Sequence, residues 1–117
     1  MNGTTTVAPV PAYDRDRLVE LFGNDPGTLA EVEREFLDTA RIAEKEIVNT
    51  TDVAAIARAA HRLKGASGVI GASSLHTIAE AVERAAKAND LPGVRRMRET
   101  FGREVERVAL QVGMASR

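Results

Sequence analysis

One of the chain's two histidines, His61, is flanked by cations and glycines at helical spacing. Arg58 and Lys64 lie three residues to either side, and Gly65 and Gly68 lie four and seven residues further on. Because a helix advances about 100° per residue, all four positions share a face with His61. A neutral imidazole, whose reference pKa is about 6.5, is a good nucleophile near neutral pH. Attack on a phosphoryl donor would place negative oxygens beside Lys64, which predicts a nucleophile with a stabilising charge.

The two glycines distinguish this face from an ordinary solvated helix surface. Glycine inside a helix costs roughly 0.5–1 kcal/mol relative to alanine, so another backbone or protein is expected to approach there. We therefore expect Arg58, Arg62, Gly65 and Gly68 to form a docking face around His61. The alternative is an exposed histidine among solvated cations, without chemistry. As an exposed helical residue, Lys64 is expected to contribute less than about 0.5 kcal/mol to stability.

His76, the second histidine, has different neighbours. Glu80, Glu83 and Lys87 share its side of the predicted helix, which we interpret as a solvated polar face without chemistry. The same interpretation applies to other charged positions, namely Glu31, Glu33, Glu35, Arg95-Arg96 and Arg98-Glu99.

Length and composition exclude several classes of protein. The 117 residues correspond to one domain, and 16 Lys and Arg against 17 Asp and Glu disfavour non-specific nucleic-acid binding. The chain has no Cys, which excludes disulfide scaffolds, cysteine-based zinc sites and thiol catalysis. No apolar run approaches the roughly 18 residues of a membrane span, and no signal peptide is visible. We expect a monomer in the cytoplasm, without membrane insertion.

Metal and nucleotide chemistry are disfavoured by the spacing of the acidic residues and glycines. A di-iron bundle needs Glu three residues before His, but Arg58 precedes His61 and Ser73 precedes His76 at that distance. Neither a His-Glu-x-x-His motif nor a Walker A loop occurs, so neither a metal nor a cofactor is expected. A hydrolase using His61 as general base would need a second carboxylate or hydroxyl nucleophile on that face, and the sequence places none there.

The elements that must position His61 are predicted to be helices, because alanine is abundant and only 3% of residues are aromatic. Residues 1–12 have no periodicity and are expected to be a tail or linker before a domain over 13–117. Apolar spacings of three and four predict five helices. The first is short, with Leu18, Val19 and Phe22 as its apolar side, and the five cover about 14–22, 28–48, 52–70, 74–88 and 92–112.

Breaks between the predicted helices are short. Asp14 is expected to cap the first helix, Thr51 or Asp52 the third, and Ser73 or Ser74 the fourth. Short turns between amphipathic helices favour antiparallel neighbours. The predicted fold is all-α, an antiparallel four-helix bundle with a short additional N-terminal helix.

The stretch from His61 to Gly71 reads HRLKGASGVIG. It closely resembles the signature of histidine-containing phosphotransfer (HPt) domains, H-x-(L/I)-K-G-(S/A)-(S/A)-x-x-(L/I/V)-G. The similarity extends over roughly residues 14–112, including Asp25-Pro26, Glu35-Phe36-Leu37 and Ala59-Ala60.

The resemblance implies a role for each matching position. His61 would be the phosphoacceptor, Lys64 its charge partner and Gly65 the open surface, while Ser67 and Gly71 would serve packing and turning. Some members place a Gln near the phosphorylated ring. The only Gln here, Gln111, lies far along the last predicted helix, so the sequence leaves open which group orients the ring.

The implied function is that of an intermediate in a His-Asp phosphorelay. His61 would accept a phosphoryl group from the aspartate of one response-regulator receiver domain and pass it to another, and a hybrid sensor histidine kinase is a further candidate partner. Mg²⁺ would be bound by the receiver. The chain lacks an ATP domain, so a phosphocarrier without autonomous kinase activity is expected. The alternative is a helical adaptor that binds receiver-like partners without phosphotransfer.

Overall fold

Six helices and no strands make up residues 10–115, the part of the chain that the computed structural model describes. The expected all-α class is confirmed over this range. The helices are α1 (Arg15–Phe22), α2 (Pro26–Val48), α3 (Val53–Val69), α4 (Ser73–Lys87), α5 (Leu91–Arg96) and α6 (Arg98–Ala115).

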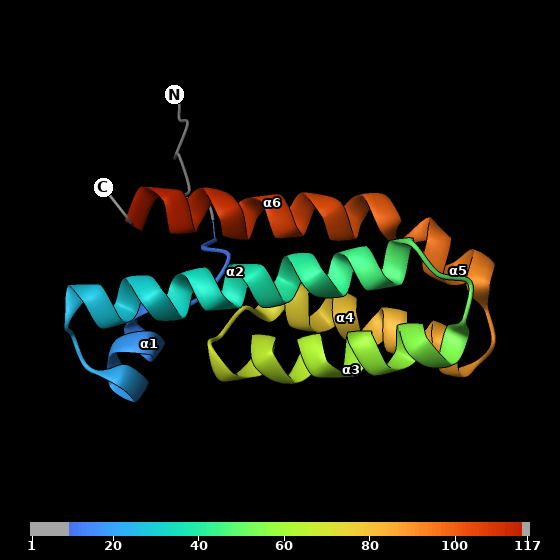
Figure 1. Cartoon of the computed structure of the whole chain (residues 1–117), viewed down its shortest axis with the longest axis horizontal. Helices are drawn as coiled ribbons and strands as arrows, with labels where there is room; N and C mark the ends of the chain where they lie inside the picture. The colour runs from blue at the N-terminus through green and yellow to red at the C-terminus, as the bar shows by residue number, and fades with distance from the viewer. Residues whose placement is uncertain (1–9, 116–117) are drawn as a thin grey trace, which may run out of the picture.

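The four long helices pack in a ring. Helix α2 contacts α3 and α6, and α4 also contacts α3 and α6, while the short α1 packs on α2 (Figure 1). In this order the α3/α4 pair lies opposite the α2/α6 pair. The colour gradient in Figure 1 shows α2 running in the direction opposite to both α3 and α6. The ring therefore has two separate outer faces, one formed by α3 and α4 and one formed by α2 and α6.

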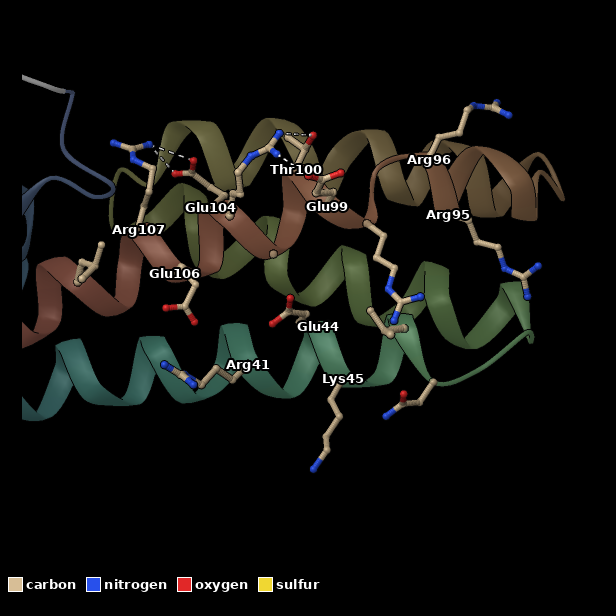
Figure 2. Close-up of a pocket in the computed structure, with 16 residues that line it drawn as sticks. Arg41, Glu44, Lys45, Arg95, Arg96, Glu99, Thr100, Glu104, Glu106 and Arg107 are labelled. Carbon is tan, nitrogen blue, oxygen red and sulfur yellow. Dashed lines mark hydrogen bonds and ion pairs between the residues drawn. The ribbon is translucent and has the colours of Figure 1, made fainter.

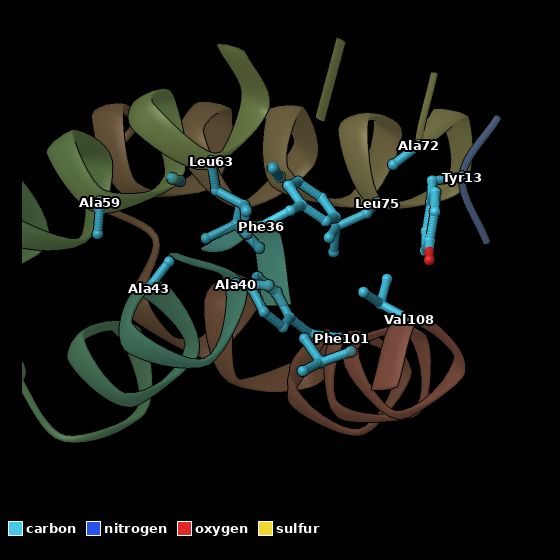
Figure 3. Packing of buried hydrophobic residues seen from close by; sticks show 14 of the residues in the cluster. Tyr13, Phe36, Ala40, Ala43, Ala59, Leu63, Ala72, Leu75, Phe101 and Val108 are labelled. Atoms are coloured by element: carbon cyan, nitrogen blue, oxygen red, sulfur yellow. The ribbon is translucent and has the colours of Figure 1, made fainter. Parts of the chain in front are cut away.

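An apolar core fills the space between the two helix pairs (Figure 3). Full burial of a large aliphatic side chain contributes roughly 1.5–3 kcal/mol, so these contacts fix the rotation of each helix. Leu63 on α3 is fully buried, and this orients the neighbouring His61 outward. Of the residues at the predicted spacings of three and four, Val32, Ile78, Ala85 and Met97 are only partly buried, and the buried ones are Leu18, Leu29, Phe36, Ala40, Ala43, Ile47, Ile56, Ala60, Leu63, Ser67, Ile70, Leu75, Ala79, Val82, Ala86, Val94, Phe101, Val105, Val108 and Val112.

Aspartate caps begin four of the helices. The carboxylates of Asp14, Asp25, Asp52 and Asp90 accept hydrogen bonds from backbone N–H groups in the first turns of α1, α2, α3 and α5. Helix α4 differs, because Ala72 is its N-cap and no side chain caps it, so the predicted Ser73 or Ser74 cap is wrong. The reason is the preceding turn, in which the Ala72 N–H already reaches back to the Ser67 carbonyl, 2.9 Å away.

The last predicted helix is two helices. Its apolar stripe continues through Met97, but the N–H of Met97 bonds the Val94 carbonyl only three residues back, at 3.1 Å. Such a tightened turn ends α5 at Arg96, and α6 begins at Arg98. Val94, Met97 and Phe101 remain three and four residues apart across this break, so the apolar pattern in the sequence looks like that of one continuous helix.

The end of the expected tail belongs to the core. Residues 1–9 lie outside the described part of the chain, but Ala12 and Tyr13 are 3% and 1% exposed. The side chain of Gln111 on α6 holds them: its Oε1 accepts from the Ala12 N–H at 2.7 Å, and its Nε2 donates to the Tyr13 carbonyl at 3.0 Å. Gln111 thus joins α6 to the segment before α1, although these residues are almost a hundred positions apart in the sequence.

Two further expectations about α1 and α2 need correction. Of the apolar side predicted for α1, only Leu18 is buried, whereas Val19 and Phe22 are 37% and 44% exposed. Glu33 does not lie on a solvated face but is 2% exposed. The Tyr13 hydroxyl donates to its carboxylate, and burial together with this carboxylate raises the pKa of Tyr13.

Candidate functional site

His61 projects from the middle of α3 into solvent. Its side chain is 67% exposed, while the residues on either side of its turn, Ala60 and Leu63, are fully buried. Because the buried positions fix the rotation of α3, the ring can face only outward along the α3/α4 side of the bundle. An incoming partner therefore has direct access to this imidazole.

The inner edge of the His61 ring rests on a buried carboxylate from the neighbouring helix. Nδ1 of His61 lies 2.8 Å from Oε2 of Glu83 on α4. The Glu83 side chain is only 5% exposed, although it reaches the ring at the surface. This contact joins residues 22 positions apart and identifies the group that orients the ring.

Glu83 is also paired with two lysines. Lys64 Nζ lies 2.8 Å from Oε1, and Lys87 Nζ lies 3.0 Å from Oε2. The hydrogen bond from Lys64, then that from Lys87, lowers the pKa of Glu83 to about 2; burial opposes this shift and the contact with His61 adds to it. The carboxylate is therefore ionised at neutral pH.

An ionised Glu83 determines which nitrogen of His61 carries the proton. A carboxylate only accepts hydrogen bonds, so the Nδ1 that faces it must donate. In the neutral ring the other nitrogen, Nε2, then carries a lone pair. The arrangement therefore directs a nucleophilic nitrogen to the exposed edge of the ring.

Helix α4 holds Lys64 at two points. Besides the ion pair of its ammonium with Glu83, its backbone carbonyl lies 2.9 Å from Nδ1 of His76. A carbonyl accepts only, so His76 donates from Nδ1. Lys64 is consequently a half-buried, doubly anchored residue and not the freely exposed lysine expected from the sequence.

The two glycines near His61 have unequal surroundings. A side chain at Gly65 would meet nothing within 4 Å, so this position is open. At Gly68 the ring of His76 lies beside the backbone, 3.5 Å from where a Cβ would be. The open surface beside His61 is therefore centred on Gly65.

The two arginines of the predicted docking face have different surroundings. Arg58 is exposed, in line with a surface that a partner can reach. Arg62 forms an ion pair with Glu46 of α2 at 2.7 Å. Arg62 thus also ties α3 to α2 beside His61.

The sequence interpretation of His76 and Glu83 as a solvated face is wrong. His76 is half-buried against Gly68 and Lys64, and Glu83 is buried. One signal in the sequence was available for Glu83. It lies four residues after Ala79 and three before Ala86, both buried stripe positions, so its place on the inner face follows from helical spacing.

A family model for the Hpt domain matches residues 20–111. This match covers most of the chain, so the protein belongs to the Hpt domain family. Comparisons with curated proteins and with solved structures gave no match. Hpt domains are helical bundles that act in phosphorelays by phosphotransfer and interact with receiver domains, and this general role extends to the chain.

Between residues 10 and 115, no helix is long and apolar enough to cross a membrane. In the same range no group of three or more His, Asp or Glu side chains is arranged to hold a metal ion.

Proposed function

We propose that His61 is the phosphoacceptor of this domain, taking a phosphoryl group from the aspartyl phosphate of one receiver domain and passing it to another. The observation that carries the proposal is the 2.8 Å contact between His61 Nδ1 and the ionised Glu83 carboxylate. The scaffold for this reaction is an antiparallel four-helix bundle of α2, α3, α4 and α6. The domain is proposed to act as a monomer in the cytoplasm.

The proposed transfer step is a displacement at phosphorus. The Nε2 lone pair of His61 forms the N–P bond while the P–O bond to the receiver aspartate breaks, and the electron pair of that bond leaves on the aspartate carboxylate. The imidazole becomes positively charged as its lone pair is shared. Glu83 faces this developing charge across the Nδ1–H hydrogen bond and stabilises it.

Lys64 is proposed to stabilise negative charge on two groups, the Glu83 carboxylate and the transferred phosphoryl group. One of its three donors is directed to Glu83, which keeps the carboxylate ionised. Its positive charge lies one helical turn from His61, where it favours the phosphoryl oxygens over longer range. Mg²⁺ and the acceptor aspartate belong to the receiver, which supplies the rest of the catalytic groups.

The receiver is proposed to dock over the open surface at Gly65, flanked by Arg58 and Arg62 with Gly68 beyond it. Exposed apolar side chains lie on the elements around this surface. Ile42 lies one turn before Glu46, the partner of Arg62, and is 60% exposed. Val69, at the end of α3, is 51% exposed. Apolar side chains around a charged centre are typical of a protein-binding surface.

The proposal is tested by incubating the domain with a receiver domain carrying a radiolabelled aspartyl phosphate. The expected result is acid-labile, base-stable label on the domain, as a phosphoramidate requires. The variant His61→Gln should take no label and unfold like the native domain, because the side chain is exposed. The matched control His76→Gln should still be labelled.

Two outcomes would overturn the assignment. Label that survives in His61→Gln would place the phosphoacceptor elsewhere. Tight binding of the receiver without any transfer of label would support the adaptor alternative.

A further inference from the structure

The face of the bundle opposite His61 carries an open groove of about 1290 Å³ along α2 and α6 (Figure 2). Its walls come from the second half of α2, from α5 and from most of α6. Since α2 and α6 form the pair opposite α3 and α4 in the helix ring, a molecule bound here leaves His61 accessible.

The groove concentrates positive charge. Seven of the 16 Lys and Arg of the chain line it, against four of its 17 Asp and Glu, although the chain as a whole has a net charge of −1. Several of these cations are not engaged elsewhere. Within residues 10–115, Arg41, Lys45, Arg95 and Arg98 form no ion pair, and Arg95 and Arg98 are exposed at the end of the groove near α5.

The remaining arginines of the groove are held in place by acids. Arg103 pairs with Glu99 at 3.0 Å, and Arg107 pairs with Glu104 at 2.9 Å. Arg96 on α5 lies 3.8 Å from Asp90, which leaves Arg95 and Arg98 at the α5 end, and Arg41 and Lys45 on the α2 wall, without an ion pair among residues 10–115. The groove floor also carries Glu44, whose carboxylate comes within 3.2 Å of where a Cβ of Gly102 would lie. The glycine therefore leaves room for this acid between the two helices.

Shape and charge pattern together identify the kind of occupant. The groove is open along α2 and α6 and does not enclose a ligand as a small-molecule pocket does, which favours an extended polypeptide. Carboxylates interspersed among its cations would repel the continuous charge of a nucleic-acid backbone, whereas a polypeptide can place acidic and neutral residues alternately. The exposed Leu110 at the opposite end offers an apolar contact.

We propose that the α2/α6 groove binds an acidic polypeptide segment of a partner protein while His61 remains free to exchange its phosphoryl group. The segment carries several Asp or Glu residues, which meet Arg95, Arg98 and Arg41, and apolar residues between them. Such a contact would tether the domain beside a partner independently of phosphotransfer and raise the effective concentration of that partner.

The test uses the whole chain and a fluorescein-labelled peptide of repeated Asp-Glu-Ser-Leu units, followed by fluorescence anisotropy. The expected result is saturable binding that weakens as salt rises, because exposed charges are screened. The double variant Arg95→Glu with Arg98→Glu should weaken binding by about tenfold or more. A matched control, Arg34→Glu with Arg84→Glu, makes the same change in net charge outside the groove and should weaken it far less.

Three outcomes would overturn the proposal. Equal loss of binding in the groove variant and in the control variant would show that only net charge matters. Tighter binding of a labelled oligothymidylate of equal net charge than of the peptide would identify a nucleic-acid surface. Amide resonance changes confined to α3 and α4 would place the peptide on the His61 face. Phosphoryl acceptance by His61 should be unchanged in the groove variant, so failure here is distinguishable from failure of the proposed function.

Discussion

His76 donates a hydrogen bond to the backbone carbonyl of Lys64, across 2.9 Å and between two helices. The same helix, α4, binds the ammonium of Lys64 two turns later through Glu83. Lys64 is thus fixed at its main chain and at its charge by residues seven positions apart on one helix face. The half of α3 that carries His61 is positioned by α4 through this pair of contacts.

Replacing His76 by phenylalanine should loosen this attachment. An aromatic ring is kept but the donor is lost, so the free energy of unfolding should fall by about 1 kcal/mol. Phosphorylation of His61 by a small donor should be slower, because Lys64 is held less firmly. His76→Asn, whose amide can donate to the same carbonyl, should restore part of both losses. Unchanged unfolding and labelling in His76→Phe would show that the contact is incidental.

The pKa of Glu83 makes the stability of the domain depend on pH in a defined direction. Since folding lowers this pKa from 4.5 to about 2, the ionised carboxylate stabilises the folded state. This contribution is fully present above about pH 4.5 and is lost as the pH falls toward 2. Glu83→Gln should therefore be less stable than the native domain at pH 7, and the difference should shrink between pH 4.5 and 2.

The measurement is denaturant unfolding of both proteins at a series of pH values. Glu80→Gln is a suitable control, because the side chain of Glu80 is 41% exposed and its one ion pair among residues 10–115 is with Arg84 at 3.6 Å. Its effect on the free energy of unfolding should be small. A stability difference for Glu83→Gln that stays constant down to pH 2 would contradict the assigned ion-pair network.

Lys64→Ala should cost more stability than an exposed lysine would. Its removal leaves a buried carboxylate with one partner fewer, which costs about 1–3 kcal/mol. Lys87→Ala removes the second lysine of Glu83, whose side chain is 66% exposed, and should cost less. Both values are read from thermal or denaturant unfolding. Phosphoryl acceptance should slow in Lys64→Ala, and a transfer rate equal to that of the native domain would remove Lys64 from the proposed mechanism.

Gly65→Glu should separate docking from chemistry. The side chain meets no atom of the domain, so the protein should fold, but it would stand one turn from His61 as an obstacle and a negative charge. Transfer from a receiver should be poor, whereas labelling by phosphoramidate should persist. Normal transfer from the receiver would mean that the partner does not approach over Gly65.

Alanine substitutions at two glycines should have opposite effects on stability. Gly65→Ala should raise the free energy of unfolding by about 0.5–1 kcal/mol, because the position is helical and open. Gly71→Ala should lower it, since Gly71 has a φ of +70° and its Cβ would lie 2.8 Å from Cβ of Asp14. Thermal unfolding of the two variants measures the direction of both stability changes. A Gly71→Ala variant more stable than the native domain would contradict this prediction.

Local signals in the sequence predicted most of the secondary structure. Apolar spacing and capping residues such as Asp52 depend only on neighbours within a few positions, so they are visible before folding. The break at Met97 was not predicted, because the stripe of Val94, Met97 and Phe101 keeps helical spacing across it. A tightened turn changes the hydrogen bonding without interrupting that pattern.

The site was predictable only in part, because sequence signals are local and its residues come from two different helices. The motif around His61 lies on one helix and is read directly from the sequence, whereas its orienting group lies on another. The burial of Glu83 depends on donors from α3 and α4 that only the folded chain brings together. Helical spacing from Ala79 and Ala86 places Glu83, unlike Glu80, on the inner face, but acidic side chains are ordinarily solvated, so the spacing does not predict its burial or its partners.

The anchoring of Ala12 and Tyr13 by Gln111 has a consequence for synthesis on the ribosome. The chain emerges from its N-terminus, and the side chain that holds this early segment is made about a hundred residues later. Until α6 has left the ribosome, the backbone N–H of Ala12 lacks its partner and the apolar faces of the earlier helices stay uncovered. The fold can therefore be completed only after α6 has been synthesised, and a nascent chain stalled before Gln111 would expose surfaces that chaperones bind.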